Sequence, residues 1–368
     1  MTPAELGFRM PAEWEPHEAT WIAWPHNQED WPGKFAPIPW VYAEIVRVLS
    51  ARENVSIVVA DRVMKRRAAG VLDRAGANLD RVTFFKAETD RVWLRDSGPT
   101  FVVRDGGGEG DDDLGPVGLI DWKFNAWAKY DNYLKDKQIP RRIARKRGLR
   151  RWTPRAEVDG GSRRVVLEGG AIDVNGKGSL LTTEECLLSD VQERNPGLGR
   201  EGIERAFADN LGATNVIWLG RGIFGDDTHG HVDDLARFVD PRTVVTVVEP
   251  DKSDPNHEPL EDNLRRLKAA RDQDGKKLRV ATLPMPAPVV FEGERLPASY
   301  ANFYIANGVV IVPTFNDPAD RVALDALAEL FPGREIVGIH CVDLVLGLGT
   351  LHCLSQQQPA APDREVKG

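Results

Sequence analysis

Four hairpin-like segments recur along the chain at nearly equal intervals, and this repeat constrains the fold more than any other sequence feature. Each places β-branched or alternating apolar residues on both sides of a short turn rich in Gly, Asn, Asp or Pro, which is typical of a β-hairpin. The turns fall near positions 107, 176, 241 and 307, which are 65 to 69 residues apart. Such regular spacing indicates one structural unit repeated along the chain. The paired runs are 101–103 with 117–120, 165–167 and 171–174 with 179–182, 236–239 with 243–248, and 302–305 with 309–312.

The intervals between the hairpins also hold amphipathic stretches and further short strands, so the unit reads ββαβ. The amphipathic stretches are 200–211, 259–271 and 319–331, and the further strands are 216–219 and 278–280. A fifth unit requires a strand at 20–24 to lie beside a C-terminal strand at 351–354, which closes a ring and removes free sheet edges. We therefore predict an α/β fold with a single domain over residues 1–368, a five-bladed pseudo-symmetric ββαβ propeller. The alternative is an ordinary α/β fold with coincidental spacing.

Composition and charge narrow the function classes. A net charge of −8 disfavours nucleic acid and anionic membranes as partners and suits a cationic ligand. The three cysteines have no CxxC spacing, which argues against a disulfide framework or a zinc knuckle. The first residues lack a basic region followed by an apolar stretch, and no run of about 18 apolar residues occurs. We expect a cytoplasmic protein.

One cysteine stands out because of its neighbours. Cys353 directly follows the glycine-rich segment Gly347-Leu348-Gly349-Thr350, where backbone and ligand can approach closely. A thiolate is the strongest nucleophile that a side chain offers, although a lone cysteine is more often a small buried apolar residue. The functional interpretation therefore depends on partners elsewhere in the chain.

Acidic and imidazole partners occupy similar positions in the repeat. Asp96, Glu168 and His231 lie 11, 8 and 10 residues before their turns, and equivalent positions in a pseudo-symmetric ring converge on its axis. Asp96 lies in a predicted strand-to-turn segment, 93–99, where an aspartate can also serve only to form the turn. Glu168 follows an apolar run and precedes two glycines, which is unusual for a merely solvated charge.

The segment 226–234 is the richest cluster of polar groups. If it is extended, its period of two places His229, His231 and Asp233 on one face. Two interpretations follow: a metal site, or a histidine general base held by carboxylates. A catalytic metal usually has three protein ligands, and the other histidines show no second pattern of this kind, so the second interpretation is favoured. The other histidines are His17, His26, His257, His340 and His352.

A thiol, an imidazole and several carboxylates in one cleft suit one reaction in particular. Carboxylates repel a thiolate and raise its pKa, so they are poor activators. They are good ligands for a planar guanidinium, whose positive charge would in turn stabilise the thiolate. Attack of the cysteine on the guanidinium carbon, loss of ammonia assisted by histidine, and hydrolysis of the amidino-cysteine amount to guanidine deimination.

Motifs along nearly the whole chain resemble the agmatine deiminases, which belong to the guanidine-modifying pentein superfamily and are related to bacterial peptidylarginine deiminases. The matching segments are 10–21, 93–99, 166–170, 181–187, 230–233, 299–307 and 352–359. The resemblance implies the five-bladed pentein α/β propeller, no metal or other cofactor, and hydrolysis of agmatine to N-carbamoylputrescine and ammonia. It also allows a homodimer.

The resemblance also assigns roles to individual residues. It implies that Cys353 is the nucleophile, that His231 is the acid and base, and that Asp96 and Asp233 grip the guanidinium. Other matching positions would line the substrate site, namely Trp93, Glu168 and Asp227.

Two departures from the family pattern lie beside these residues. His229 stands where the family often has Asp, and Gly347-Leu348-Gly349-Thr350-Leu351 replaces a Gly-Gly-Gly-Asn-Ile motif. These departures leave open the chemical identity of the substrate's end distant from the guanidinium, so arginine or peptidyl-arginine is the main alternative substrate. A metal-dependent amidohydrolase and a non-catalytic pentein binding module are further alternatives.

Four residues near these motifs carry weaker predictions. Arg95 and Arg221 could pair with a substrate carboxylate if they point into the site. Ser97 and Cys186 have no assigned role, and we expect Cys186 in the core.

Overall fold

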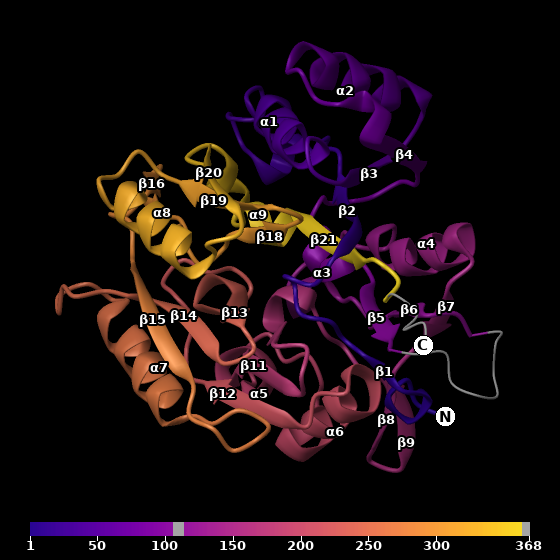
Figure 1. Ribbon diagram of the computed structural model, residues 1–368, viewed down its shortest axis with the longest axis vertical. Helices are drawn as coiled ribbons and strands as arrows, with labels where there is room; N and C mark the ends of the chain where they lie inside the picture. Colours follow the sequence, from indigo (N-terminus) through magenta and orange to yellow (C-terminus); the bar gives the residue numbers. More distant parts are fainter. Residues whose placement is uncertain (106–113, 363–368) are drawn as a thin grey trace, which may run out of the picture.

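The computed structural model describes residues 1–105 and 114–362, and the strands in this part form several small sheets with helices on their outer sides (Figure 1). In five sheets of three or four strands, an antiparallel pair is followed by a strand that joins in parallel. The chain therefore has an α/β fold. The predicted hairpin turn near 107 lies outside the described residues.

The strands of the five sheets come from successive parts of the chain, except where the two ends meet. The first sheet contains β1 (Phe8–Arg9), β5 (Thr100–Arg104), β6 (Val117–Ile120) and β7 (Arg150–Trp152). The second contains β10 (Asp173–Val174), β11 (Ser179–Thr183) and β12 (Asn215–Leu219). The third contains β13 (Ala236–Asp240), β14 (Thr243–Val248) and β15 (Arg279–Pro284). The fourth contains β18 (Tyr304–Ala306), β19 (Val309–Thr314) and β20 (Glu335–His340). The fifth contains β21 (Ser355–Pro359), β2 (His17–Ala23), β3 (Asn54–Val59) and β4 (Val82–Lys86).

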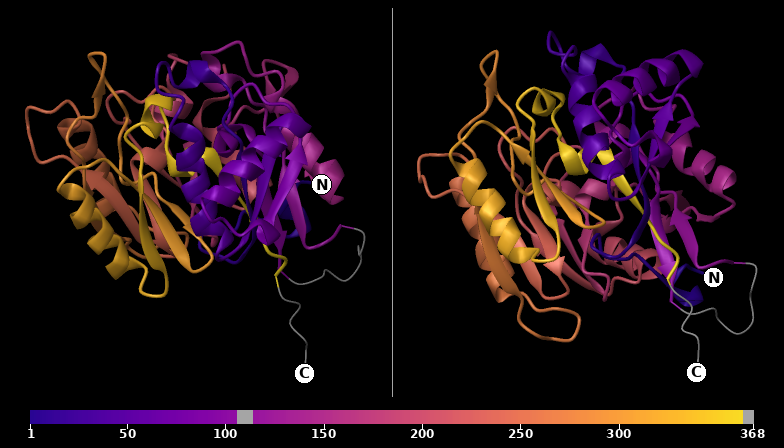
Figure 2. Two further views of the ribbon diagram at one scale, coloured as in Figure 1. Left: turned by 90° about the horizontal axis from the view of Figure 1, so that it is seen from above. Right: turned by 45° about the horizontal axis from the view of Figure 1, so that its top comes forward.

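Helices connect the parallel strands, and α7 and α8 cover the outer sides of their sheets (Figure 2). The longer helices are α1 (Ile38–Ser50), α2 (Arg62–Arg74), α4 (Ile139–Arg147), α6 (Gly199–Leu211), α7 (His257–Ala269) and α8 (Ala319–Leu330). The short ones are α3 (Leu94–Ser97), α5 (Glu184–Leu188) and α9 (Leu351–Leu354). Short 3-10 turns include η4 (Ala126–Ala128), η6 (Gly169–Ala171) and η7 (Val232–Asp234). Two small hairpins are β8 (Arg155–Val158) with β9 (Gly161–Arg164), and β16 (Val290–Phe291) with β17 (Glu294–Arg295).

Local chemistry explains why the predicted hairpins form. The turns between β10 and β11 and between β18 and β19 contain Asn-Gly pairs, and Gly176 and Gly308 have φ values of +68° and +70°. Glycine reaches such values without the steric cost that a side chain brings. The flanking runs of Val, Ile and Leu are buried and form the core between sheets and helices.

The predicted pairing of the strand near residues 20–24 with the C-terminal strand is confirmed, but the predicted position of the C-terminal strand was wrong. β21 runs antiparallel to β2, and it begins four residues later than expected. Residues 351–354 form the helical turn α9 instead, because Asn302 accepts hydrogen bonds from the backbone N–H groups at the start of that turn.

Three further local predictions were wrong for related reasons. Segment 226–234 is not extended, since the Asp226 carboxylate accepts backbone hydrogen bonds from residues 228, 230 and 231 and bends the chain. Segment 93–99 contains the helical turn α3 rather than a strand end. The run 165–167 forms only an isolated bridge, because Asn195 occupies both backbone polar groups of Val166.

No helix in the described part of the chain is long and apolar enough to cross a membrane.

Candidate active site

The five residues predicted to carry chemistry are buried in one place. Asp96 lies in α3, Asp233 in η7 and Cys353 in α9, while Glu168 and His231 directly precede η6 and η7. Their exposed fractions are between 0% and 6%.

Gly170 marks the point where three of these side chains meet. A Cβ atom at this position would lie 2.5 Å from His231 Nδ1, 2.9 Å from Asp96 Oδ1 and 3.1 Å from Asp233 Oδ2. Any side chain here would collide with all three groups. Gly170 in the Glu168-Gly169-Gly170 motif thus allows the backbone to lie against the three side chains.

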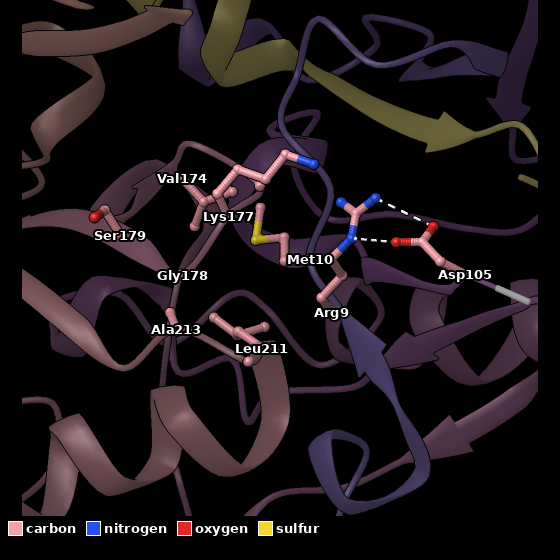
Figure 3. Close-up of a pocket in the computed structure, with 11 residues that line it drawn as sticks. Arg9, Met10, Asp105, Val174, Lys177, Gly178, Ser179, Leu211 and Ala213 are labelled. Atoms are coloured by element: carbon pink, nitrogen blue, oxygen red, sulfur yellow. Dashed lines mark hydrogen bonds and ion pairs between the residues drawn. The ribbon is translucent and has the colours of Figure 1, made fainter. Parts of the chain in front are cut away.

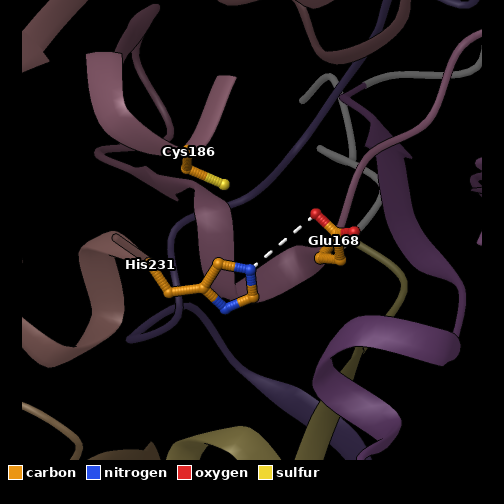
Figure 4. Close-up of side chains that lie close together, drawn as sticks. All are labelled: Glu168, Cys186 and His231. Carbon is orange, nitrogen blue, oxygen red and sulfur yellow. Dashed lines mark ion pairs between the residues drawn. The ribbon is translucent and has the colours of Figure 1, made fainter. Parts of the chain in front are cut away.

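His231 lies between the carboxylates of Asp96 and Glu168 without a hydrogen bond to either. Figure 4 shows the imidazole beside Glu168. Its Nδ1 is 3.8 Å from Asp96 Oδ1, its Nε2 is 3.8 Å from Glu168 Oε2, and neither ring nitrogen has a hydrogen-bond partner among the described residues. Burial disfavours a charge on the ring, but the carboxylates outweigh it and raise the pKa of His231 well above its usual value. The ring is therefore suited to donate a proton.

Asp96 is held in place by two hydrogen bonds. Trp127 Nε1 donates to Oδ2 at 2.9 Å, and the backbone N–H of Gly170 donates to Oδ1 at 3.0 Å. Burial, together with the charges of Asp233 and Glu168, raises the pKa of Asp96 to about 6.

Glu168 keeps its charge despite complete burial. Burial alone would raise its pKa, but the guanidinium of Arg194, whose Nε lies 3.2 Å from Oε1, lowers the pKa below its usual value. Arg194 also donates to the backbone oxygen of Thr228, at 2.6 Å, so it connects Glu168 to the loop before His231.

The thiol of Cys353 lies close to a side-chain donor and to a carboxylate. Asn302 Nδ2 lies 3.1 Å from Sγ, and Asp233 Oδ2 lies 3.7 Å from it. Burial and then the charges of Asp233, Asp234 and Asp96 raise the pKa of Cys353 well above its usual value. This direction is the one expected from the repulsion between carboxylates and a thiolate.

Asp233 is fixed from behind by the imidazole that precedes the thiol in sequence. His352 Nδ1 lies 2.7 Å from Asp233 Oδ2, and His352 Nε2 lies 2.8 Å from Glu13 Oε2. Burial opposes ionisation of Asp233, but the contact with His352 lowers its pKa below the usual value. Asp233 Oδ1 has no hydrogen-bond partner within residues 1–105 and 114–362.

A narrow pocket leads to the thiol. Its lining consists of Arg91, Trp93, Asp96, Trp127, Tyr130, Asp227, Thr228, Gly347, Leu348 and Cys353. Four predicted site residues line this pocket, and aromatic rings form much of its wall. Such a wall suits a flat cation.

Asp227 is already paired with neighbours from segment 126–130. Lys129 forms an ion pair with Oδ1, and Tyr130 Oη donates to Oδ2 at 2.7 Å. Arg91 stacks over the Tyr130 ring at 4.1 Å and pairs with Asp30 at 3.0 Å. The wall around Asp227 therefore holds cations as well as carboxylates.

The weaker sequence predictions have mixed outcomes. Arg95 is buried and donates to Gln357, while Arg221 lines a different pocket, so neither lines the pocket that leads to Cys353. His229 contacts Ser189 at 3.1 Å and does not share a face with His231, contrary to the prediction. Cys186 is buried as expected, but it lies beside His231 and Glu168 (Figure 4).

Sequence reasoning missed several residues that hold the cluster together. They are Glu13, Trp127, Arg194, Asn302 and His352. Three of them lie inside or beside the motif segments 10–21, 299–307 and 352–359, which was the available signal. Trp127 and Arg194 lie in no motif.

Two groups of side chains have the spacing of metal ligands. They are Glu168 with Cys186 and His231, and Asp233 with Asp234 and Cys353. The first group includes a carboxylate already held by Arg194, and a guanidinium next to a cation is unfavourable. The residues of this group are therefore a poor fit for a resident metal ion.

A separate pocket of about 650 Å³ lies near β1 and the β10–β11 turn (Figure 3). Arg9 on its wall pairs with Asp105 at 2.9 Å. None of the predicted site residues lines this pocket.

The structural class of this protein is an α/β fold of several small sheets with a buried cluster of a thiol, an imidazole and carboxylates. The chain belongs to the Porphyromonas-type peptidyl-arginine deiminase family, whose model matches residues 9–359.

Several similar proteins are agmatine deiminases, and a solved structure from Porphyromonas gingivalis, described as a putative arginine deiminase, has a TM-score of 0.82 and 34% identity. An agmatine deiminase of Pseudomonas aeruginosa is 37% identical over 98% of this chain and 97% of its own length, and one of Stutzerimonas stutzeri is 38% identical over the same shares. The solved agmatine deiminase of Enterococcus faecalis has a TM-score of 0.86 and 32% identity, with 98% of each chain covered. A substrate-bound agmatine deiminase of C. jejuni has a TM-score of 0.82 and 28% identity, with 97% of each chain covered.

Proposed function

We propose that this protein hydrolyses agmatine to N-carbamoylputrescine and ammonia through an amidino-cysteine intermediate. The observation that carries the proposal is the buried cluster of Cys353, His231, Asp96, Asp233 and Glu168 at the end of an aromatic pocket. The full-length similarity to agmatine deiminases supports the substrate.

We also propose that the five sheets are blades of one pentein propeller, in a single domain over residues 1–368. The same order of antiparallel and parallel strands in each sheet supports this proposal, as does the pairing of β2 with β21. The site then lies where the inner ends of the blades meet.

In the proposed complex, carboxylates bind the guanidinium before any bond changes. Asp96 and the unpartnered Oδ1 of Asp233 would accept hydrogen bonds from its nitrogens, and Glu168 would contribute a third negative charge. The substrate's positive charge would then offset the carboxylates that raise the pKa of Cys353, so the thiolate forms when the substrate is bound.

The first half-reaction forms the covalent intermediate. Cys353 Sγ attacks the guanidinium carbon, and the thiol proton passes through His231 to the leaving nitrogen. The C–N bond breaks and ammonia departs, which leaves an amidino group on the sulfur. Carboxylates on the guanidinium keep its charge on the nitrogens, so the central carbon remains electrophilic.

The second half-reaction releases the product. With ammonia gone, His231 accepts a proton from a water molecule that attacks the amidino carbon. The C–S bond breaks, the thiol is restored, and N-carbamoylputrescine leaves. No step requires a metal ion.

The far end of the substrate distinguishes agmatine from arginine. Asp227 near the pocket wall suits a second ammonium group, which would compete with Lys129 for the carboxylate. Arg91 and Lys129 also offer a partner for a carboxylate, so arginine or peptidyl-arginine remains the alternative substrate.

Ammonia release from a panel of substrates at equal concentration tests the proposal. We expect agmatine to exceed arginine, arginine methyl ester and peptidyl-arginine. Faster release from arginine would refute the agmatine proposal and retain deimination, while no release from any of them would refute both.

A further inference from the structure

We infer that Asn302 is a further catalytic residue, whose side-chain amide donates a hydrogen bond to Cys353 Sγ and stabilises the thiolate. The inference rests on the proposed function for its role in turnover. Its direct test, the reactivity of the thiol, requires no substrate.

The orientation of the Asn302 amide follows from its partners. Oδ1 accepts hydrogen bonds from Thr350 Oγ1 at 2.7 Å, from His352 N at 3.0 Å and from Cys353 N at 3.4 Å. All three partners are donors here, so the oxygen must face them and the NH₂ group must face the other way.

The two N–H groups of Asn302 then have two acceptors. Nδ2 lies 3.1 Å from Cys353 Sγ and 2.9 Å from Asp234 Oδ1. Asn302 is 1% exposed, so solvent does not compete for these bonds. A hydrogen bond to an ionised acceptor is stronger than one to a neutral acceptor, and this one therefore favours the thiolate over the thiol.

The charges around the sulfur make this donor important. Asp233, Asp234 and Asp96 all act against ionisation of Cys353. Asn302 offers a donor to the sulfur and also binds Asp234, one of the opposing carboxylates. The contact with Asp234 favours the ionised form of that carboxyl, so the amide favours the thiolate through its direct hydrogen bond to the sulfur.

Asn302 also shapes the turn that carries the nucleophile. Its backbone oxygen accepts from His352 N at 3.2 Å, in addition to the three contacts of Oδ1. If Asn302 had only a structural role, these contacts with α9 would be its whole function. The test must therefore distinguish an effect on the position of α9 from an effect on the ionisation of the Cys353 thiol.

The rate of Cys353 alkylation by iodoacetamide makes this separation. The rate is measured in the free enzyme over a range of pH, with the Cys353 peptide quantified by mass spectrometry, because Cys186 and Cys341 are also free. Asn302→Ala removes the donor, and Asn302→Asp replaces it with an acceptor but retains an oxygen for Thr350 and the turn. Thr350→Val removes one anchor of the turn and leaves the donor.

We expect alkylation of both Asn302 variants to slow about tenfold or more at a given pH. This corresponds to a thiol pKa higher by about one unit, the size expected when a hydrogen bond to a charged atom is lost. Thr350→Val should retain the wild-type pH dependence. Asn210→Ala is a matched control, since Asn210 is a buried asparagine whose side chain, within the described part of the chain, donates to the backbone oxygen of Ala206 in α6.

Thermal unfolding of each variant shows whether the fold is retained. If Asn302→Ala unfolds, Asn302→Asp carries the test, because it keeps the oxygen that anchors the turn. Folded Asn302 variants with the wild-type rate and pH dependence of alkylation would overturn the inference. Slower alkylation in an enzyme that does not turn over agmatine would uphold the inference and reject the proposed function.

Discussion

The imidazole of His352 and the carboxylate of Asp233 are joined through Nδ1 and Oδ2 at 2.7 Å, directly behind the thiol of Cys353. On its other side, His352 contacts Glu13, which also pairs with Arg237 at 2.8 Å. Among the residues that the structure describes, Oδ1 of Asp233 has no hydrogen-bond partner and can accept a bond from a ligand. The proposed nucleophile and one proposed guanidinium ligand are therefore positioned by the same buried network.

Replacement of Cys353 by Ser should abolish turnover. A hydroxyl cannot supply the anion that the proposed attack requires, so we expect a loss of about 10³-fold or more with a normal fold. Mass spectrometry of wild-type enzyme quenched during turnover should show an amidino adduct on Cys353. Cys186→Ser serves as the control, and near-normal activity of Cys353→Ser would contradict the proposed role.

The two neighbouring histidines should differ in importance. His231→Ala removes the proposed acid and base, and such losses are typically about 10²–10⁴-fold in kcat. His229 contacts Ser189 instead, so His229→Ala should be clearly milder. Equal losses in the two variants, measured as kcat at saturating substrate, would argue against this assignment.

The acid side of the pH–rate profile should report Asp96. Below its pKa of about 6 the carboxyl carries a proton and loses the charge that binds the guanidinium, so kcat/KM should rise with pH through about 6. Asp96→Asn should lower kcat/KM and remove this step. An unchanged acid limb in that variant would assign the step to another group.

Treatment with a chelator should leave the rate unchanged. Glu168 is held by Arg194 and is a poor candidate for a metal ligand, so we expect thiol and imidazole chemistry alone. The measurement is activity after dialysis against EDTA, with elemental analysis of the purified protein. Loss of activity that one added metal restores would favour the amidohydrolase alternative.

Stability should fall as pH rises from about 4 to about 7. Burial raises the pKa of Asp136 to about 7, so the folded state binds a proton that the unfolded state has lost in this range. The free energy of unfolding therefore decreases as the pH rises, until the Asp136 carboxyl is ionised in both the folded and the unfolded state. Asp136→Asn retains an acceptor for the backbone N–H of Asp90 and should flatten this slope in denaturant titrations, whereas an identical slope would assign it to other buried acids.

The sequence contained enough information to predict the units of the fold. Runs such as 243–248 and 309–312 consist of β-branched residues, which favour strands, and the Asn-Gly turns determine the hairpins locally. The short turns were less predictable because hydrogen bonds between side chains and the backbone create them. Asp226 bends segment 226–234 and Asn302 folds α9, and no periodicity reports such side-chain to backbone bonds.

The candidate site was predictable only in part, for a similar reason. Cys353, His231 and Glu168 stand out by residue type and by glycine neighbours, and the structure brings them together with Asp96 and Asp233. Partners that act by hydrogen bonding left a weaker signal. His352 and Asn302 are common residue types in apolar surroundings, and only the folded arrangement shows what they contact.

The pairing of β2 with β21 has a consequence for how this protein forms on the ribosome. Trp21 and Gln358 share a hydrogen bond of 2.9 Å although 337 positions separate them. The nascent chain must therefore carry an unpaired strand edge until its last sheet emerges, and pairing at such separation is intrinsically slow. Because α9 directly precedes β21, the thiol reaches its partners only in that final step, and an incomplete chain has no assembled site that could react prematurely.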